Sequence, residues 1–342
     1  MSIGRSATGK DLPMKRYAIS LIFALLFLPL GAQITLKVAA FVPQNSPWDA
    51  GIKRLAADFE RVSGGRVRLA FPQSLKGASE ADIIQKLRLG LDGALLSTTG
   101  LAQLDPNTLA ISMPSVIQND EELAAVLTAV DPMIKAKIGQ RYAVLAIARA
   151  GWVRLFSKEP IVTPQDLAKY RISVPNGDEL VDRIFQSIGA RTVKGDFTSL
   201  FLQLSSNAVD VFYTSPVMVA GLWSQFKGKV SYISPFPISP YIAAIVFNKT
   251  SWERVPADIR PALEAAAKKI GDDMAADGAK MENDAMASLI GAGMIVPPST
   301  PADKASWGKV YEDRRHGMFA EMFSPEFLSA IDDAIAKARP TH

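Results

Sequence analysis

Residues 142–157 read "YAVLAIARAGWVRLFS", and this stretch decides how the rest of the chain is interpreted. Its apolar and β-forming residues predict one long extended segment. The segment stands between two regions that each alternate predicted strands with predicted helices. We therefore interpret it as the crossing from one domain of an α/β protein to the next.

The region before this segment begins with a predicted strand at residues 34–41, followed by a helix whose apolar residues recur at helical spacing. Further strands are predicted at 66–71 and 93–101. Ser79 and Asn119 precede two more helical patterns as N-caps. Strands separated by helices with short links predict βαβ units.

The same alternation restarts after the segment and ends in one long helix, predicted over residues 258–289 and stopped at Gly291-Ala292-Gly293. At 1.5 Å per residue this helix is about 48 Å long, which exceeds the width of one small domain. We expect it to lie against both domains. Two α/β halves joined in this way predict a two-lobed binding protein whose ligand lies between the lobes, beyond the carboxyl ends of the strands.

Residues 1–32 have the pattern of a secretory signal peptide. Lys15 and Arg16 precede an apolar run from Ala18 to Leu30, and small residues follow. The run to Ala32 is roughly 15 residues long, whereas a membrane span needs about 20.

Without this leader the net charge falls from +4 to about +1, which argues against a nucleic-acid partner. The sequence contains no cysteine, so it predicts neither a lipidated N-terminus nor a disulfide framework. The remaining residues, about 310, suit two domains.

The sequence contains few residues from which a conventional active site is built. Its only histidines are His316 and the terminal His342, and it holds no P-loop, GxGxxG, HExxH or GxSxG pattern. We therefore expect no catalytic activity, no metal site and no cofactor. If the protein were instead an enzyme, Asp210 and Tyr213 would be its only plausible catalytic acid or base.

A series of motifs gives the chain a family resemblance. In order, they are "SGGRVRLAFPQ", "LRLGLDGALL", "ISMPSV", "PIVTPQDLAKYRISVP", "IGARTV", "LQLSSNAVDV" and "VFNKTSWERVPADIRPALEAAAKK". Together they resemble the extracytoplasmic solute-binding proteins of TRAP transporters, the DctP family, over roughly residues 35–315. The resemblance implies a periplasmic receptor that closes around a small solute and delivers it to a TRAP membrane permease.

The resemblance also implies a fold of the type II periplasmic-binding-protein kind, with mixed sheets flanked by helices and one long helix spanning both lobes. Lobe I would comprise residues 33–147 plus about 237–270, and lobe II residues 148–236 plus about 271–342. Closure would occur about the segments 147–151 and 236–240.

Residues 170–178, "YRISVPNGD", depart from the family pattern. Most members place lysine, an apolar residue, arginine and valine on this strand, and the arginine clamps the carboxylate of the ligand. Here Arg171 stands at the lysine position and Ser173 at the arginine position. Arg171 lies about 6.6 Å back along the strand, away from its carboxyl end, so we expect Ser173 at the clamp position.

A second departure is Ser215, which stands before Pro216 where members often have an amide side chain. A hydroxyl cannot replace the charge-assisted pair that an arginine makes with a carboxylate. Arg154 is the best substitute cation in these motifs. The candidate ligand-binding residues are therefore Trp48, Thr98, Thr99, Trp152, Arg154, Ser173, Asn176, Tyr213, Ser215, Phe236 and Tyr241.

This set is aromatic and small, which favours an apolar or amphipathic solute. The phrases "WVRLFSKEPIVTPQDL" and "NKTSWERVP" are similar to the subgroup that works with a tetratricopeptide-repeat protein, so such a partner is also implied. The alternatives are an organic acid held by Arg154 or Arg171, a periplasmic enzyme, and a scaffold protein without a small ligand.

Overall fold

The computed structural model describes residues 4, 33–40, 42, 46–75 and 78–339. The predicted signal peptide, residues 1–32, lies outside these ranges except for Gly4.

The first part of the chain alternates strands and helices as the sequence predicts. Its elements are β1 (Ile34–Ala40), α2 (Pro47–Val62), β2 (Val67–Ala70), η1 (Gln73–Leu75), α3 (Glu80–Arg88), β3 (Gly93–Ser97), α4 (Thr98–Ala102), η2 (Pro106–Ser112) and α5 (Asp120–Ile138). Ser79 and Asn119 are the N-caps of α3 and α5, because each side chain accepts a backbone N–H of the first helical turn.

The second part begins with the long strand. Its elements are β4 (Tyr142–Ser157), α6 (Pro164–Leu167), β5 (Arg171–Pro175), α7 (Glu179–Ser187), β6 (Arg191–Gly195), α8 (Phe197–Ser205), β7 (Val211–Thr214), α9 (Pro216–Gly221), α10 (Trp223–Phe226), β8 (Tyr232–Ile233), β9 (Ser239–Asn248), α11 (Lys249–Glu253), α12 (Arg260–Gly291), α13 (Pro301–Glu312), η3 (Arg315–Phe319), α14 (Ala320–Met322) and α15 (Pro325–Ala338).

One prediction about these elements needs correction. The stretch "GALLSTTGL" at residues 93–101 was expected to be a strand throughout, but the strand β3 ends at Ser97. The Ser97 side chain accepts the N–H groups of Thr99 and Gly100 and so caps the helix α4. Local capping therefore overrides the β-propensity of Thr98 and Thr99.

The described strands form a mixed sheet in the order β2-β1-β3-β9-β4-β7-β5-β6, with β8 paired to β4. Strand β4 joins the two halves: residues 142–153 pair antiparallel with β9, and residues 154–157 pair with β7. Its register is irregular between Arg149 and Gly151, and Gly151 has a φ of 130°. The prediction that residues 142–157 form the crossing segment is confirmed.

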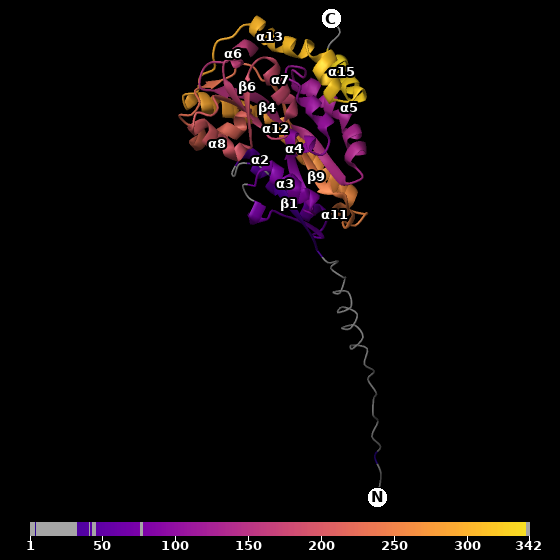
Figure 1. Ribbon diagram of the computed structural model, residues 1–342. Coiled ribbons are helices and arrows are strands. Elements are labelled where there is room, and N and C mark those ends of the chain that lie inside the picture. Colours follow the sequence, from indigo (N-terminus) through magenta and orange to yellow (C-terminus); the bar gives the residue numbers. More distant parts are fainter. Residues whose placement is uncertain (1–3, 5–32, 41, 43–45, 76–77, 340–342) are drawn as a thin grey trace.

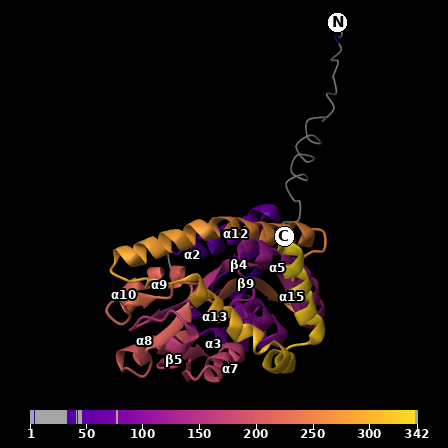
Figure 2. The ribbon, with the colours of Figure 1, turned by 90° about the horizontal axis from the view of Figure 1, so that it is seen from above.

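The long helix α12 has 32 residues, starts and ends within two residues of the predicted limits, and runs along one side of the molecule (Figure 2). It packs on α2 in the first half, on the shared strand β4, and on α9 in the second half. Close packing on β4 requires small residues, since a Cβ at Gly271 would lie 3.0 Å from the Ala148 Cβ. The predicted contact of this helix with both halves is confirmed.

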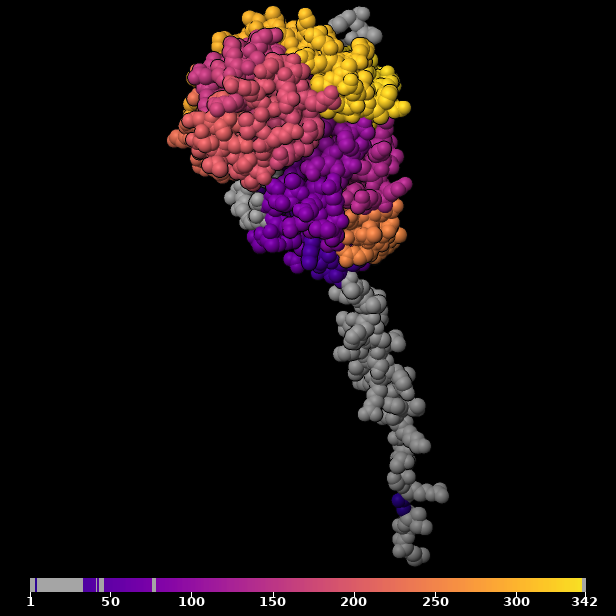
Figure 3. Space-filling view, viewed as in Figure 1, coloured from indigo at the N-terminus to yellow at the C-terminus, as the bar shows by residue number. Residues whose placement is uncertain are grey.

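The halves themselves can be followed in two views. Figure 1 places β1 and α3 in the lower part of the molecule and α7 and β6 in the upper part, with α8 at the left and α15 beside α5. In the space-filling view the indigo and red parts of the chain meet along a line across the visible face (Figure 3). Among the described residues, no helix is both long and apolar enough to cross a membrane.

Candidate ligand-binding cleft

A polar cavity of about 120 Å³ lies at the carboxyl ends of β3, β5, β6 and β7, so both halves of the molecule line it. Five of the predicted ligand-binding residues line this cavity, namely Thr98, Thr99, Asn176, Tyr213 and Tyr241. Their position agrees with the rule that ligands of open α/β sheets lie beyond the carboxyl ends of strands.

The charged side chains that line this cavity are all acidic among the described residues: Glu80, Asp178 and Asp196. Burial raises the pKa of Glu80, whose carboxylate accepts the backbone N–H of Ser97 at 2.6 Å and its hydroxyl at 2.5 Å. The pKa of Asp196 is lowered, chiefly by the hydroxyl of Thr198. No group of three or more His, Cys, Asp or Glu side chains in the described ranges is arranged to hold a metal ion.

Asp178 is a second buried carboxyl group of this cavity. Burial raises its pKa to about 6, although Tyr213 donates a hydrogen bond to its Oδ2 at 2.6 Å and the N–H of Val181 one to its Oδ1 at 3.2 Å. The hydroxyl of Tyr213 is held in turn by this bond, and burial raises its pKa. Two neutral donors therefore face a carboxyl group that is only 8% exposed.

An apolar cavity of about 100 Å³ adjoins the polar one and lies between α2, α12 and the sheet. Trp48 lines it from α2 and Met274 from α12, and it shares Ser97, Met218 and Tyr241 with the polar cavity. The rings of Trp48 and Tyr241 lie 6.3 Å apart at 55°. The predicted residue Trp48 is thus placed beside, rather than in, the polar part of the cleft.

Arg171 is paired with a carboxylate outside the cavities. Its Nε and Nη2 each donate to an oxygen of Asp210 at 2.9 Å, and its backbone N–H donates to the same side chain at 3.1 Å. Arg171 is partly exposed. Burial by itself would raise the pKa of Asp210, but the hydrogen bonds and the positive charge of Arg171 outweigh this effect and lower it. The expectation that Arg171 faces a surface carboxylate rather than the cleft agrees with this geometry.

Ser173 and Ser215 are buried and occupied elsewhere. Ser173 has the predicted strand position, but its hydroxyl donates to Oε1 of Gln203 at 2.8 Å, and it does not line the polar cavity. Ser215 is fully buried and caps α9, accepting the N–H of Val217. The structure therefore places neither hydroxyl at the cavity surface, in contrast to the expectation for Ser173.

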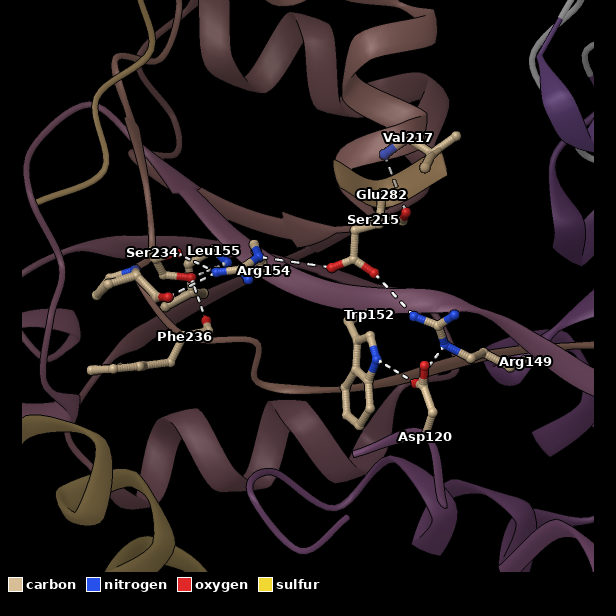
Figure 4. A network of polar contacts seen from close by, with 11 residues as sticks. Asp120, Arg149, Trp152, Arg154, Leu155, Ser215, Val217, Ser234, Phe236 and Glu282 are labelled. Atoms are coloured by element: carbon tan, nitrogen blue, oxygen red, sulfur yellow. Dashed lines mark hydrogen bonds and ion pairs between the residues drawn. The ribbon is translucent and has the colours of Figure 1, made fainter. Parts of the chain in front are cut away.

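Arg154 belongs to a buried network of polar contacts on β4 (Figure 4). Its Nη1 donates to the carbonyls of Ser234 and Pro235 at 3.0 and 2.9 Å, and its Nε lies 3.9 Å from Glu282. It lines neither cavity, and backbone carbonyls and Glu282 already contact it, so its role as the substitute cation stays a prediction.

The same network includes Arg149, which forms ion pairs with Asp120 at 2.8 Å and with Glu282 at 3.4 Å. Trp152, a predicted ligand residue, donates its indole N–H to Asp120. Trp152 and the predicted residue Phe236 both line a separate cavity beside α13. Their aromatic character alone was therefore a poor guide to the cleft.

Two residues that the sequence analysis did not select are Glu80 and Asp178. Both stand at the start of a helix, Glu80 in the first turn of α3 and Asp178 as the N-cap of α7. Acidic residues are common there for local reasons, so these two residues show no sequence signal beyond ordinary capping. The one usable signal was position, because Asp178 follows the carboxyl end of a predicted strand.

The fold and the cleft define a two-lobed solute-binding protein. Residues 38–321 match the bacterial extracellular solute-binding proteins of family 7, DctP, and the chain belongs to this family. The predicted resemblance is thereby confirmed.

Several known proteins of this kind are distantly similar to the chain in sequence. The chain is 25% identical to a solute-binding protein of Roseobacter denitrificans over 52% of its own length and about half (55%) of that protein. It is 22% identical to the C4-dicarboxylate-binding periplasmic protein DctP of Rhodobacter capsulatus over 94% of its length and 96% of that protein. A TRAP periplasmic solute-binding protein of Sulfurospirillum deleyianum, crystallised with succinate, has the same fold with a TM-score of 0.79 at 19% identity, covering 89% of this chain and 100% of that one.

Proposed function

We propose that this protein is the periplasmic receptor of a TRAP-type transporter and that its cleft captures an apolar or amphipathic solute without an arginine clamp. The observation that carries the ligand class is the composition of the polar cavity, which no Lys, Arg or His of the described residues lines. Arg149 lines the adjoining apolar cavity, where Asp120 and Glu282 pair with it. The two arginines that offered an alternative clamp are each held by other groups.

Capture would occur by closure of the two lobes about the segments 147–151 and 236–240, with the bound solute stabilising the closed population. The lobe limits given above, 33–147 plus about 237–270 and 148–236 plus about 271–342, are part of this proposal. Gly151, with its positive φ and the irregular register around it, supports the first of these hinge segments.

Export by residues 1–32 as a cleaved, non-lipidated signal peptide places the receptor in the periplasm in this proposal, where it meets the membrane permease. The tetratricopeptide-repeat partner also stays a proposal, which rests only on the two phrases of sequence. A catalytic role would need turnover of a bound compound. Asp210 does not line the cleft, and its ion pair with Arg171 argues against it as a catalytic base.

The test begins with protein purified natively from the periplasm. Mass spectrometry of the small molecules released on denaturation identifies the captured compound, and calorimetry then compares this compound with succinate. We expect an uncharged or amphipathic compound, with an affinity that changes less than threefold in Arg154→Met and in Arg171→Met.

The organic-acid alternative predicts the opposite result. Loss of a charge-assisted pair to a carboxylate costs about 1.5–3 kcal/mol, which is a loss of roughly tenfold or more in affinity. Such a loss for an organic acid in either arginine variant, with the melting temperature preserved, would contradict the proposed ligand class and leave the receptor role intact.

A further inference from the structure

The cleft has two chemically different ends. The polar cavity and the apolar cavity share Ser97, Met218 and Tyr241, so they adjoin each other. Carboxylates line the polar end, whereas Trp48, Met274 and aliphatic side chains line most of the apolar end. Arg149 also lines the apolar end, but its guanidinium is paired with Asp120 and Glu282. A ligand that fills both ends must therefore itself have one polar and one apolar part.

The polar end is suited to a donor rather than to an acceptor. Two of its three carboxylates are engaged locally: Glu80 by Ser97 at both oxygens, and Asp196 by Thr198 and the first turn of α8. From the residues that the structure describes, Asp178 accepts one hydrogen bond at each oxygen, and each oxygen of a carboxylate has room for a second.

Because Asp178 is buried, the hydrogen bonds that its carboxylate could still accept are energetically important. A carboxylate removed from water is costly unless a cation or several donors compensate it, and neutral donors alone compensate it incompletely. A ligand carboxylate in this cavity would instead be repelled by three acidic groups and would find no cation among the described residues.

We propose that the ligand is a protonated primary or secondary amine attached to an apolar group. The ammonium donates to Asp178 beside Tyr213, and the apolar group lies between Trp48, Tyr241 and Met274. This inference rests on the proposed receptor function and refines its ligand class.

Two further features of the apolar end support this arrangement. The rings of Trp48 and Tyr241 lie 6.3 Å apart at 55° and offer aromatic surfaces on which the apolar part of the ligand can pack. The indole N–H of Trp48 is buried and has no hydrogen-bond acceptor in the part of the chain that the structure describes, which is rare for a buried donor. An ether, hydroxyl or carbonyl oxygen on the apolar part of the ligand would satisfy it.

The experiment compares amines with carboxylates of the same carbon skeleton. Calorimetry and thermal shift at pH 7.5 would use 4-phenylbutylamine and the n-alkylamines from butylamine to decylamine, each beside the matching carboxylate, with succinate as the family's small diacid. We expect at least one amine to bind at least tenfold more tightly than its carboxylate.

Two variants locate the binding. Asp178→Asn removes the charge but keeps the helix cap, because Asn caps helices as well as Asp does, and it should weaken amine binding at least tenfold. Ala243→Leu places a larger side chain in the wall of the apolar cavity and should weaken the longer amines more than butylamine. Asp105→Asn is the matched control, since Asp105 is also a buried helix cap but does not line the cleft, and it should bind like the wild type.

Three outcomes would overturn the inference: tighter binding of the carboxylates, binding of none of the amines, or amine binding that Asp178→Asn leaves unchanged. Each of these is separate from the failure of the proposed function. That failure would be the absence of any co-purifying or added compound that stabilises the wild-type protein.

Discussion

Asp178 shows how one residue serves both folding and the cleft. Its side chain caps α7 and faces the polar cavity, and its carboxyl group is buried beside Tyr213, Glu179 and Asp182. The two neighbouring carboxylates on α7 reinforce the effect of burial, while Tyr213 opposes it. The residue therefore has a good local reason to be acidic and a large energetic cost for being ionised.

This cost predicts a pH dependence of stability. The pKa of Asp178 is about 6 in the folded protein and 3.8 for the unperturbed group, so the folded state retains the proton more strongly. Stability from this group is complete below about pH 4 and is lost as pH rises through 6, by roughly 3 kcal/mol in total. Asp178→Asn should not show this loss, so its unfolding free energy relative to wild type should rise between pH 4 and pH 7.

Urea unfolding at pH 4, 5, 6 and 7 measures this difference, and Asp105→Asn controls for the loss of a buried capping carboxylate. Taking the difference between variant and wild type removes the titration of Glu80, which the two proteins share. A difference that stays constant across this pH range would show that Asp178 titrates as an exposed carboxyl group does.

At the scale of elements, helix α12 holds the crossing strand in place. Glu282 projects from this helix between Arg149 and Arg154 of β4, and all three side chains are largely buried. Gly278, one turn earlier, has no side chain because a Cβ there would lie 2.6 Å from Nη1 of Arg149. The helix thus combines a small residue and a carboxylate to accommodate two buried guanidinium groups.

Removing this carboxylate should destabilise the protein strongly. Glu282→Ala leaves two buried cations with fewer partners, for which we expect a loss of about 3 kcal/mol. Asp284→Ala on the same helix removes an exposed ion pair with Lys280 and should cost at most about 0.5 kcal/mol. Equilibrium urea unfolding compares the two, and equal losses would mean that the network contributes no more than a surface pair.

At the scale of the whole molecule, the two halves are connected by strands β4 and β9, with α12 lying across both. Gly151 stands on β4 three residues before pairing with β9 gives way to pairing with β7 at Arg154. Its φ of 130° is open to glycine and strained for other residues, and Oγ of Ser215 would lie 3.4 Å from an added Cβ. We propose that the lobes rotate about this point.

Gly151→Ala should lower the unfolding free energy by about 1–3 kcal/mol, the usual cost of a residue in a disfavoured backbone region. Gly291→Ala is the control, because Gly291 ends α12 with no atom within 4 Å of an added Cβ, and it should be neutral or slightly stabilising.

Small-angle scattering of the wild type should show contraction when the solute binds. An unchanged scattering profile on saturation would contradict closure.

The sequence alone determined the fold and the family. Alternating strands and helices, capping residues such as Ser79 and Asn119, the long strand and the long helix are encoded in local patterns, and local patterns can be read without coordinates. The alternation of side chains along β5 can also be read from the sequence, and Ile172 and Val174 are indeed buried on one face of this strand.

Only the tertiary structure decided which side chains meet in the cleft. Arg154, Trp152, Ser173 and Ser215 all look suitable in sequence, yet each is held by a partner distant in the chain or by its own helix. Conversely, Glu80 and Asp178 are 98 positions apart by their numbers and line one cavity. Which partner a polar side chain finds depends on long-range packing of the sheet and helices, and the order of residues along the chain does not specify that packing by any local rule.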